Sequence, residues 1–246
     1  MFFEHVRREI LLRIFLSALV LCIFFYSVFR TPQVVEVPEA PYQLAYEELY
    51  VNATPSEQDV PTVVLLHGAG GDAKDLLFLF EEVRTPLRVI SFTGPFSYAG
   101  GHAWLEQGSS EEVRQQYLVV GSSIVGAIQS LVPSVQKQPV ALVGFSQGAS
   151  LGYYLSLAYP EFFSISIPVA GSLDARVTPL SVSPGTSYPA VRALHGEHDA
   201  IIAIDEAEYS VKILHDFGLN ATLKTFTTGH TITPLMREEI VTLLGV

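Results

Sequence analysis

Two patterns of hydrophobic residues alternate along most of the chain. Short apolar runs such as TVVLLHG (62–68) and PVALVG (139–144) are typical of strands that are buried on both faces of a sheet. Longer segments between them, such as 111–131, have apolar residues at helical spacing. The pattern predicts strands at 42–51, 62–68, 87–92, 139–144, 164–171, 190–196 and 221–227, and helices at 74–83, 111–131, 147–158, 204–217 and 232–243.

This alternation indicates one doubly wound α/β domain, which we place at residues 42–246. Apolar strands that alternate with helices form a mostly parallel sheet with helices on both faces. The first strand, 42–51, is expected at an edge. In sheets of this kind the functional residues gather at the carboxyl ends of the strands.

The first 41 residues have a different pattern. Residues 10–29 read ILLRIFLSALVLCIFFYSVF, 20 residues with a single charge at Arg13, which is long enough for a membrane-spanning helix. No A-x-A-like cleavage site follows, which favours an uncleaved anchor over a cleaved signal peptide. A lipidated Cys22 is disfavoured by the bulky Leu21 before it. We therefore predict a membrane anchor at 1–30 and a proline-containing linker at 31–41.

The charges beside this segment predict its orientation. Arg7, Arg8 and Arg13 lie before or inside it, whereas no Lys or Arg occurs between Arg30 and Lys74. Basic flanks stay on the cytoplasmic side of a membrane. We expect the N-terminus inside and the domain on the outer side, with secretion after signal cleavage as the alternative.

The remaining charges exclude one class of partner. The chain has 14 basic and 25 acidic side chains, of which four basic and two acidic ones lie in residues 1–30. Residues 31–246 therefore have ten basic and 23 acidic side chains, a net charge of −13. Nucleic-acid binding needs clustered Lys and Arg, so we expect no nucleic-acid partner. The single cysteine excludes a disulfide within the chain.

A glycine-flanked serine stands between a predicted strand and a predicted helix. The stretch Gly144-Phe145-Ser146-Gln147-Gly148 has the context of a nucleophile elbow, with an ordinary strand-to-helix turn as the alternative. Such a turn strains the serine backbone and leaves no room for side chains two residues before and after it. The new helix then directs its first N–H groups toward developing negative charge.

A serine nucleophile needs a base, and the base needs an orienting acid. His230, in TTGHTIT, follows the last predicted strand, and Asp199 follows the strand 190–196. The chain order Ser, Asp, His is that of α/β-hydrolases. Asp205 is the competing acid, but its place at the start of the next helix is explained by N-capping.

Two further roles follow from the neighbouring loops. A metal site made of His195, His198 and Asp199 is conceivable, but no further ligands at a fixed spacing support it, so we expect no metal. In HGAGG, the N–H of Ala69 is the expected second oxyanion donor beside that of Gln147, with Gly70 as the fallback. His67 is expected to fix this loop by a hydrogen bond.

Four motifs together resemble the carboxylesterase/phospholipase family of α/β-hydrolases, which includes acyl-protein thioesterases. They are LLHGAGGDAKDLL, GFSQGAS, LHGEHD and a GH before a helix, and the resemblance covers roughly residues 60–245. It implies Ser146 as nucleophile, His230 as base and Asp199 as acid, with Ala69 and Gln147 as oxyanion donors and no cofactor.

A family loop with an aromatic residue near the pocket resembles GGHAWLEQ. This would place Trp104, together with Gly70, at the substrate pocket, with a core position as the alternative for Trp104. The chain departs from the family pattern in two places. It has a predicted N-terminal anchor segment, and Asp199 is followed by AIIAIDE, where the family commonly has a hydrophobic residue and then Pro.

These observations predict a serine esterase for small or medium acyl esters. No long insertion is present to form a large lid, and thioesters and lysophospholipids remain open as substrates. A serine peptidase or amidase, which would use the same triad, and a non-catalytic binding protein of this fold are the alternatives.

Overall fold

The computed structural model describes residues 42–55, 60–179, 181–183 and 185–246. The predicted anchor at 1–30 and linker at 31–41 lie outside these ranges. Within them, no helix combines the length and hydrophobicity needed to cross a membrane. The described residues belong to one compact unit.

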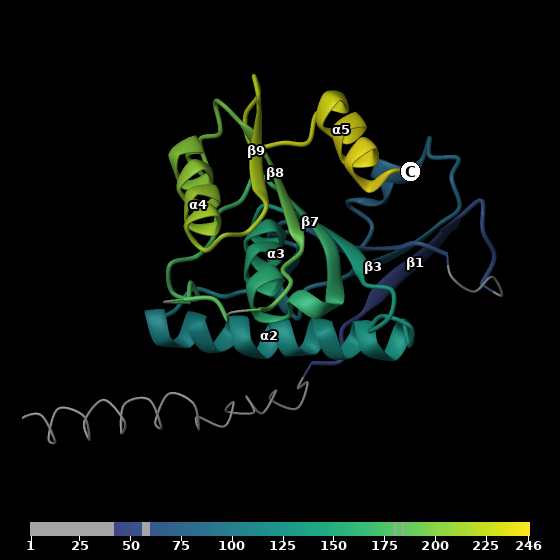
Figure 1. Cartoon of the computed structure of the whole chain (residues 1–246), viewed down its shortest axis with the longest axis horizontal. Helices are drawn as coiled ribbons and strands as arrows, with labels where there is room; N and C mark the ends of the chain where they lie inside the picture. Colours follow the sequence, from purple (N-terminus) through teal and green to yellow (C-terminus); the bar gives the residue numbers. More distant parts are fainter. Residues whose placement is uncertain (1–41, 56–59, 180, 184) are drawn as a thin grey trace, which may run out of the picture. The chain divides into compact units, whose positions relative to one another are not determined.

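The described residues form a seven-stranded sheet of order β1-β3-β2-β6-β7-β8-β9. Only β1 at the edge is antiparallel to its neighbour; the other strands are parallel (Figure 1). The mostly parallel α/β sheet and the edge position of the first strand are therefore confirmed. The strands are β1 (Tyr46–Val51), β2 (Thr62–Leu66), β3 (Leu87–Phe92), β6 (Val140–Phe145), β7 (Phe163–Val169), β8 (Ala190–Gly196) and β9 (Ala221–Phe226).

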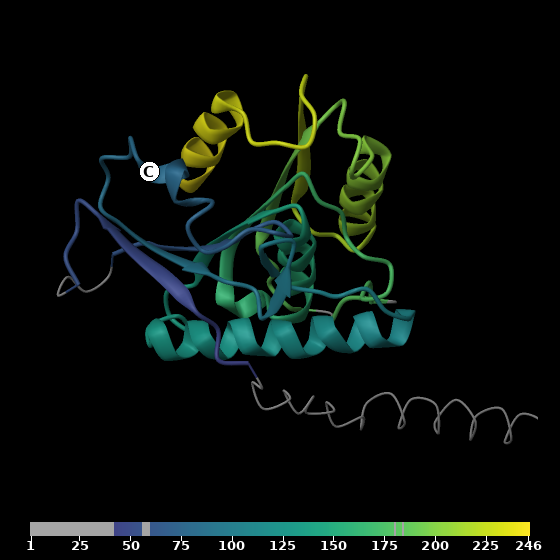
Figure 2. The same ribbon diagram turned by 180° about the vertical axis from the view of Figure 1, so that it is seen from behind.

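Helices cover both faces of this sheet. Helices α2 (Ser110–Leu131) and α3 (Gln147–Ala158) lie on one side, and α5 (Pro234–Leu244) lies on the other (Figures 1 and 2). Helix α4 (Ile204–Asp216) packs on β8 and β9, and its buried residues share a cluster with Tyr153 of α3. Each of these four helices lies within two residues of its predicted limits.

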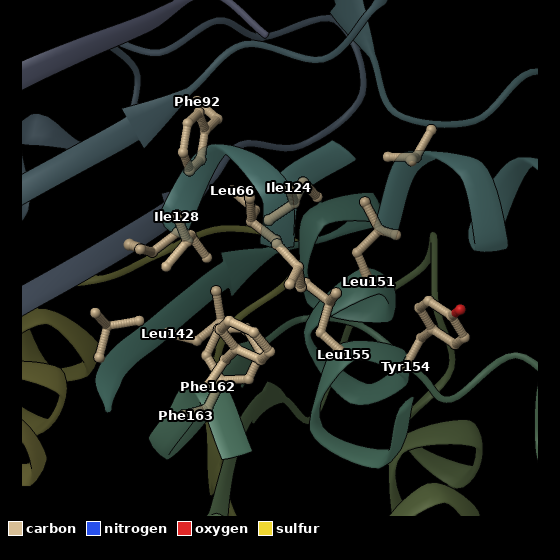
Figure 3. Packing of buried hydrophobic residues seen from close by; sticks show 14 of the residues in the cluster. Leu66, Phe92, Ile124, Ile128, Leu142, Leu151, Tyr154, Leu155, Phe162 and Phe163 are labelled. Atoms are coloured by element: carbon tan, nitrogen blue, oxygen red, sulfur yellow. The ribbon is translucent and has the colours of Figure 1, made fainter. Parts of the chain in front are cut away.

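Burial of apolar side chains between α2, α3 and the sheet forms the larger core (Figure 3). Burying a side chain of this size contributes roughly 1.5–3 kcal/mol, so this layer holds α3 firmly against β6 and β7. The labelled members are Leu66, Phe92, Ile124, Ile128, Leu142, Leu151, Tyr154, Leu155, Phe162 and Phe163. Phe162 belongs to a short 3₁₀ turn, η2 (Pro160–Phe162).

The predicted helix at 74–83 is wrong. This segment consists of turns around a short 3₁₀ helix, η1 (Leu77–Phe80). Its backbone bonds span three residues rather than four, as in Leu77 N–H to Lys74 O at 3.1 Å and Leu79 N–H to Leu76 O at 3.2 Å. Apolar residues at i and i+3 suit both geometries, so spacing alone does not separate them.

A two-stranded hairpin, β4 (Phe96–Tyr98) and β5 (Gly101–Ala103), was not predicted. Each strand has three residues, too few to show an alternating pattern. Both turn residues have positive φ, 51° at Ala99 and 85° at Gly100. Two-residue hairpin turns with this geometry usually contain Asn-Gly. Here the first turn residue is Ala99, so the sequence lacks the usual pair and the turn was not predicted.

Candidate active site

Ser146 stands at the junction of β6 and α3 in a strained backbone conformation. Its φ is 53° and its ψ is −117°, a region that residues with side chains rarely occupy. A Cβ added to Gly144 would lie 2.3 Å from the carbonyl oxygen of Gly148, and one added to Gly148 would lie 2.2 Å from that of Leu66. Only glycine fits at these two positions, so the turn has the construction that the sequence predicted.

Three side chains from distant parts of the sequence form a chain of hydrogen bonds at this turn. His230 Nε2 lies 2.9 Å from Ser146 Oγ, and His230 Nδ1 lies 2.7 Å from Asp199 Oδ2. A carboxylate accepts, so Nδ1 carries the ring proton and Nε2 is left to accept from the serine hydroxyl. The three parallel strands β6, β8 and β9 bring them together, because each residue follows the carboxyl end of its strand.

The Asp199 carboxylate is held from several sides. Its side chain is 0% exposed, and its Oδ1 accepts the N–H groups of Ile201 at 2.9 Å and Ile202 at 3.0 Å. Burial opposes ionisation, but the hydrogen bonds from Ile202, His230 and Ile201 outweigh it and hold the pKa of Asp199 below its usual value. Asp199 is therefore an anion fixed opposite the His230 ring.

This lowered pKa predicts how stability depends on pH. A carboxyl whose pKa is lower in the folded state stabilises the fold above its unfolded pKa, about 3.9, and loses that contribution as the pH falls through the folded value. We expect the difference in free energy of unfolding between wild type and Asp199→Asn to shrink as the pH falls below about 4, where the carboxyl takes up its proton. Urea unfolding from about pH 5 downward measures this difference, and a difference that grows over this interval would contradict the assignment.

Two backbone N–H groups beside Ser146 are free to bind an anion. They belong to Ala69 and to Gln147, the first residue of α3, and within the described chain neither has a hydrogen-bond partner. The N–H of Gly70, the fallback donor, instead bonds His102 O at 2.7 Å. The geometry therefore favours Ala69 over Gly70 as the second donor.

The loop that carries Ala69 is held by its surroundings. His102 in β5 bonds it twice, since its O accepts from Gly70 and its N–H donates to Gly71 O at 2.8 Å. Below the loop, buried His67 accepts the N–H of Gly94 at 2.9 Å. Burial lowers the pKa of His67, which keeps the ring neutral and able to accept that bond. Its Nδ1 then carries the hydrogen and donates to Gly68 O at 2.6 Å, so the hydrogen bond expected of His67 within this loop is confirmed.

Trp104 lies in the core rather than at the cleft. It is 0% exposed, and its indole Nε1–H donates to His67 O at 2.8 Å. Its position as a pocket wall is therefore wrong, and the alternative core position is correct. The Gln147 side chain, whose role the sequence did not suggest, holds this segment by accepting Trp104 N–H at 2.7 Å and donating to Leu105 O at 2.9 Å.

A cleft of about 430 Å³ opens beside His230. Backbone of the Ala69 loop forms one wall, including Gly70, which the sequence placed at the pocket. The other walls are mainly apolar but include the polar side chains of Asp75, Thr231 and His230. The lining consists of Gly68, Ala69, Gly70, Gly71, Asp75, Leu76, Phe78, Phe145, His230, Thr231 and Ile232.

The sequence suggested two further roles near Asp199: a metal site made of His195, His198 and Asp199, and an N-cap of the next helix by Asp205. His198 is exposed while His195 is buried, and no group of three or more His, Cys, Asp or Glu among the described residues could hold a metal. Asp205 lies in the first turn of α4, but the N-cap is Ala203 and no side chain caps the helix. The N-capping role of Asp205 is therefore wrong; an acid in a first turn complements the helix dipole instead.

Solved structures of carboxylesterases and of an acyl-protein thioesterase have a similar fold. The fold is similar to a carboxylesterase from Bacillus cereus (20% identity, TM-score 0.69, covering 83% of this chain and 95% of that one). It is also similar to acyl-protein thioesterase 2 from Zea mays (19%, 0.62, 82% and 97%) and to a carboxylesterase from Mesorhizobium loti (19%, 0.65, 82% and 94%). At such identities the likeness shows a shared fold.

The sequence comparison goes further than the fold. Residues 49–245 match the family model described as phospholipase/carboxylesterase, which agrees with the resemblance seen in the four motifs over roughly residues 60–245. With the strand order, the strained serine turn and this match together, the chain belongs to the phospholipase/carboxylesterase family of α/β-hydrolases.

Proposed function

We propose that this chain is a serine esterase in which Ser146, His230 and Asp199 act as a catalytic triad. The observation that carries the proposal is the unbroken hydrogen-bond chain from Ser146 Oγ through both nitrogens of His230 to Asp199. A serine hydroxyl becomes a good nucleophile when a positioned base removes its proton. The strained turn supports the same role, because strain of this kind persists where it holds a reacting group in place.

The first half of the reaction forms an acyl-enzyme. Ser146 Oγ attacks the ester carbonyl while His230 Nε2 takes the hydroxyl proton, and the negative Asp199 stabilises the resulting imidazolium. The N–H groups of Ala69 and Gln147 bind the oxyanion of the tetrahedral intermediate. His230 then gives its proton to the leaving alcohol as the carbon–oxygen bond breaks.

The second half returns the enzyme to its starting state. His230 removes a proton from water, the resulting hydroxide attacks the acyl carbon, and the same two N–H groups bind the second oxyanion. Collapse releases the acid, and His230 returns its proton to Ser146 Oγ. Every proton is carried by His230, so the sequence of steps uses no cofactor.

The cleft supports small or medium acyl esters as substrates. Its volume of about 430 Å³ lies toward the lower end of the usual range for small-molecule sites. Leu76, Phe78, Phe145 and Ile232 favour apolar groups next to the reacting carbonyl. The same chemistry extends to thioesters and lysophospholipids, which have acyl carbonyls of comparable reactivity.

Matched esters and amides test this class of activity. The full-length protein is expected to hydrolyse p-nitrophenyl acetate, butyrate and octanoate at least about 10²-fold faster than the p-nitroanilides with the same acyl groups. Burst release of p-nitrophenol would indicate the acyl-enzyme. Anilides cleaved as fast as the esters would favour the peptidase or amidase alternative. Equal background rates with both would contradict catalysis on these groups.

We also propose, from the sequence alone, that residues 1–30 anchor the protein in a membrane with the domain on the outer side. The support is the apolar run 10–29 and the basic residues before it. Full-length protein is expected in the membrane fraction after an alkaline wash, and protein lacking residues 1–30 in the soluble fraction. Recovery of soluble protein shortened by about 30 residues would instead indicate signal cleavage.

A further inference from the structure

The Asp199 carboxylate lies between two imidazole rings, and the proposed mechanism uses only one of them. His230 Nδ1 is 2.7 Å from Asp199 Oδ2, and His195 Nε2 is 3.5 Å from the same oxygen. The His195 side chain is 1% exposed and that of Asp199 is 0% exposed. An ionisable ring of this kind is seldom buried without a specific polar partner.

The partners of His195 assign its proton. Nε2 lies 2.9 Å from the carbonyl oxygen of Ile202, and a carbonyl can only accept, so Nε2 carries the hydrogen. The same N–H has Asp199 Oδ2 as a second, more distant acceptor, a contact that is weaker as a hydrogen bond. The main bond of His195 is therefore to the backbone of Ile202.

That carbonyl belongs to the turn that holds the carboxylate. Asp199 Oδ1 accepts the N–H groups of Ile201 and Ile202, while the C=O of Ile202 is bound by His195. His195 lies in strand β8, four residues before Asp199. Strand β8 pairs in parallel with a neighbouring strand on each side. The ring thus joins the turn at 199–202 to a rigid strand.

We propose that His195 is a positioning residue for the esterase reaction. By holding the Ile202 carbonyl it fixes the turn at 199–202, and so keeps Asp199 Oδ2 aimed at His230 Nδ1. This alignment keeps the His230 proton on Nδ1 and leaves Nε2 free to accept from Ser146. The inference rests on the proposed triad, but it concerns a residue that does not touch the substrate.

Substitution of His195 tests the role by kinetics. His195→Leu in the full-length protein is expected to lower kcat for p-nitrophenyl butyrate about 10- to 100-fold with KM changed less than about twofold, because orientation rather than binding is lost. His195→Gln keeps an N–H that can reach the Ile202 carbonyl, and we expect it to restore most of the loss. His198→Leu, in the same loop but exposed, is the matched control and is expected to leave kcat unchanged.

A double-mutant cycle separates positioning through Asp199 from a general loss of packing. In the Asp199→Asn background, His195→Leu is expected to have less than about a twofold effect on the residual kcat, because the carboxylate through which it acts is gone. A loss of the same size in both backgrounds, or an unchanged kcat for His195→Leu alone, would overturn the proposal. Thermal unfolding of each variant shows whether it is folded.

A proton NMR measurement gives a readout that does not depend on turnover. The proton between His230 Nδ1 and Asp199 should resonate at lower field than the other N–H protons and vanish in Asp199→Asn. We expect it to broaden or move upfield in folded His195→Leu and to return in His195→Gln; an unchanged resonance in the leucine variant contradicts positioning. If instead the esterase activity itself is absent, hydrolysis independent of Ser146 shows that failure, while the resonance still decides the role of His195.

Discussion

Replacing Ser146 with alanine is expected to lower kcat for p-nitrophenyl butyrate by about 10⁶-fold, down to the slow hydrolysis that the oxyanion site alone supports. No other hydroxyl can take its place, because among the described residues only the Ser146 hydroxyl bonds His230 Nε2, at 2.9 Å, and stands on a backbone with positive φ. Removal of the Oγ leaves the fold intact, since the side chain is not part of the hydrophobic core.

A matched substitution controls for the loss of a hydroxyl as such. Ser130 lies exposed on α2, away from the site, and Ser130→Ala is expected to leave kcat and thermal stability unchanged. Stopped-flow and long-time steady-state assays with the same ester cover the range of rates. Retention of more than about one hundredth of the activity in folded Ser146→Ala would mean that another group is the nucleophile.

Asp199→Asn is expected to lower kcat by about 10⁴-fold with little change in KM. The reason is the proton on the neighbouring ring. An asparagine amide can donate to His230 Nδ1, and the ring then carries its proton on Nε2, where it cannot accept from Ser146. The geometry of the site is kept while the base is lost.

The second acid that the sequence offers is the control for this substitution. Asp205 is exposed in the first turn of α4, and Asp205→Asn is expected to retain full activity. Measuring kcat for both variants with one ester compares the two carboxylates directly. Greater loss at Asp205 than at Asp199 would show that the acid has been assigned wrongly.

Most of the fold could be predicted because its strands are buried on both faces. Continuous apolar runs such as VVLL in β2 are typical of strands covered by helices on either side, and their alternation with helices restricts the sheet to a mostly parallel one. The exceptions are local. At η1, apolar residues three apart suit a 3₁₀ turn as well as an α-helix, and the hairpin β4–β5 has strands too short to show a period.

The site could be predicted only where its chemistry limits the choice of residue. A serine between two glycines and a histidine after the last strand are read from the chain in order, and the structure brings Ser146 and His230 together. Contacts that link distant segments are invisible in one sequence. The bond between the Gln147 side chain and Trp104 depends on packing, and no spacing along the chain records it. The sequence brought His195 and Asp199 together only as conceivable metal ligands, and the bond from His195 to the Ile202 carbonyl was not predicted.

Covalent labelling with a fluorophosphonate tests the central claim most directly, because the reagent reacts with an activated serine and mimics the tetrahedral intermediate at the oxyanion site. Intact-mass analysis of the full-length protein is expected to show one adduct per chain, located at Ser146 by peptide mapping. Ser146→Ala should remain unlabelled, and Asp199→Asn should be labelled much more slowly. An unlabelled wild-type protein that is folded, or an adduct on any other residue, would contradict the account.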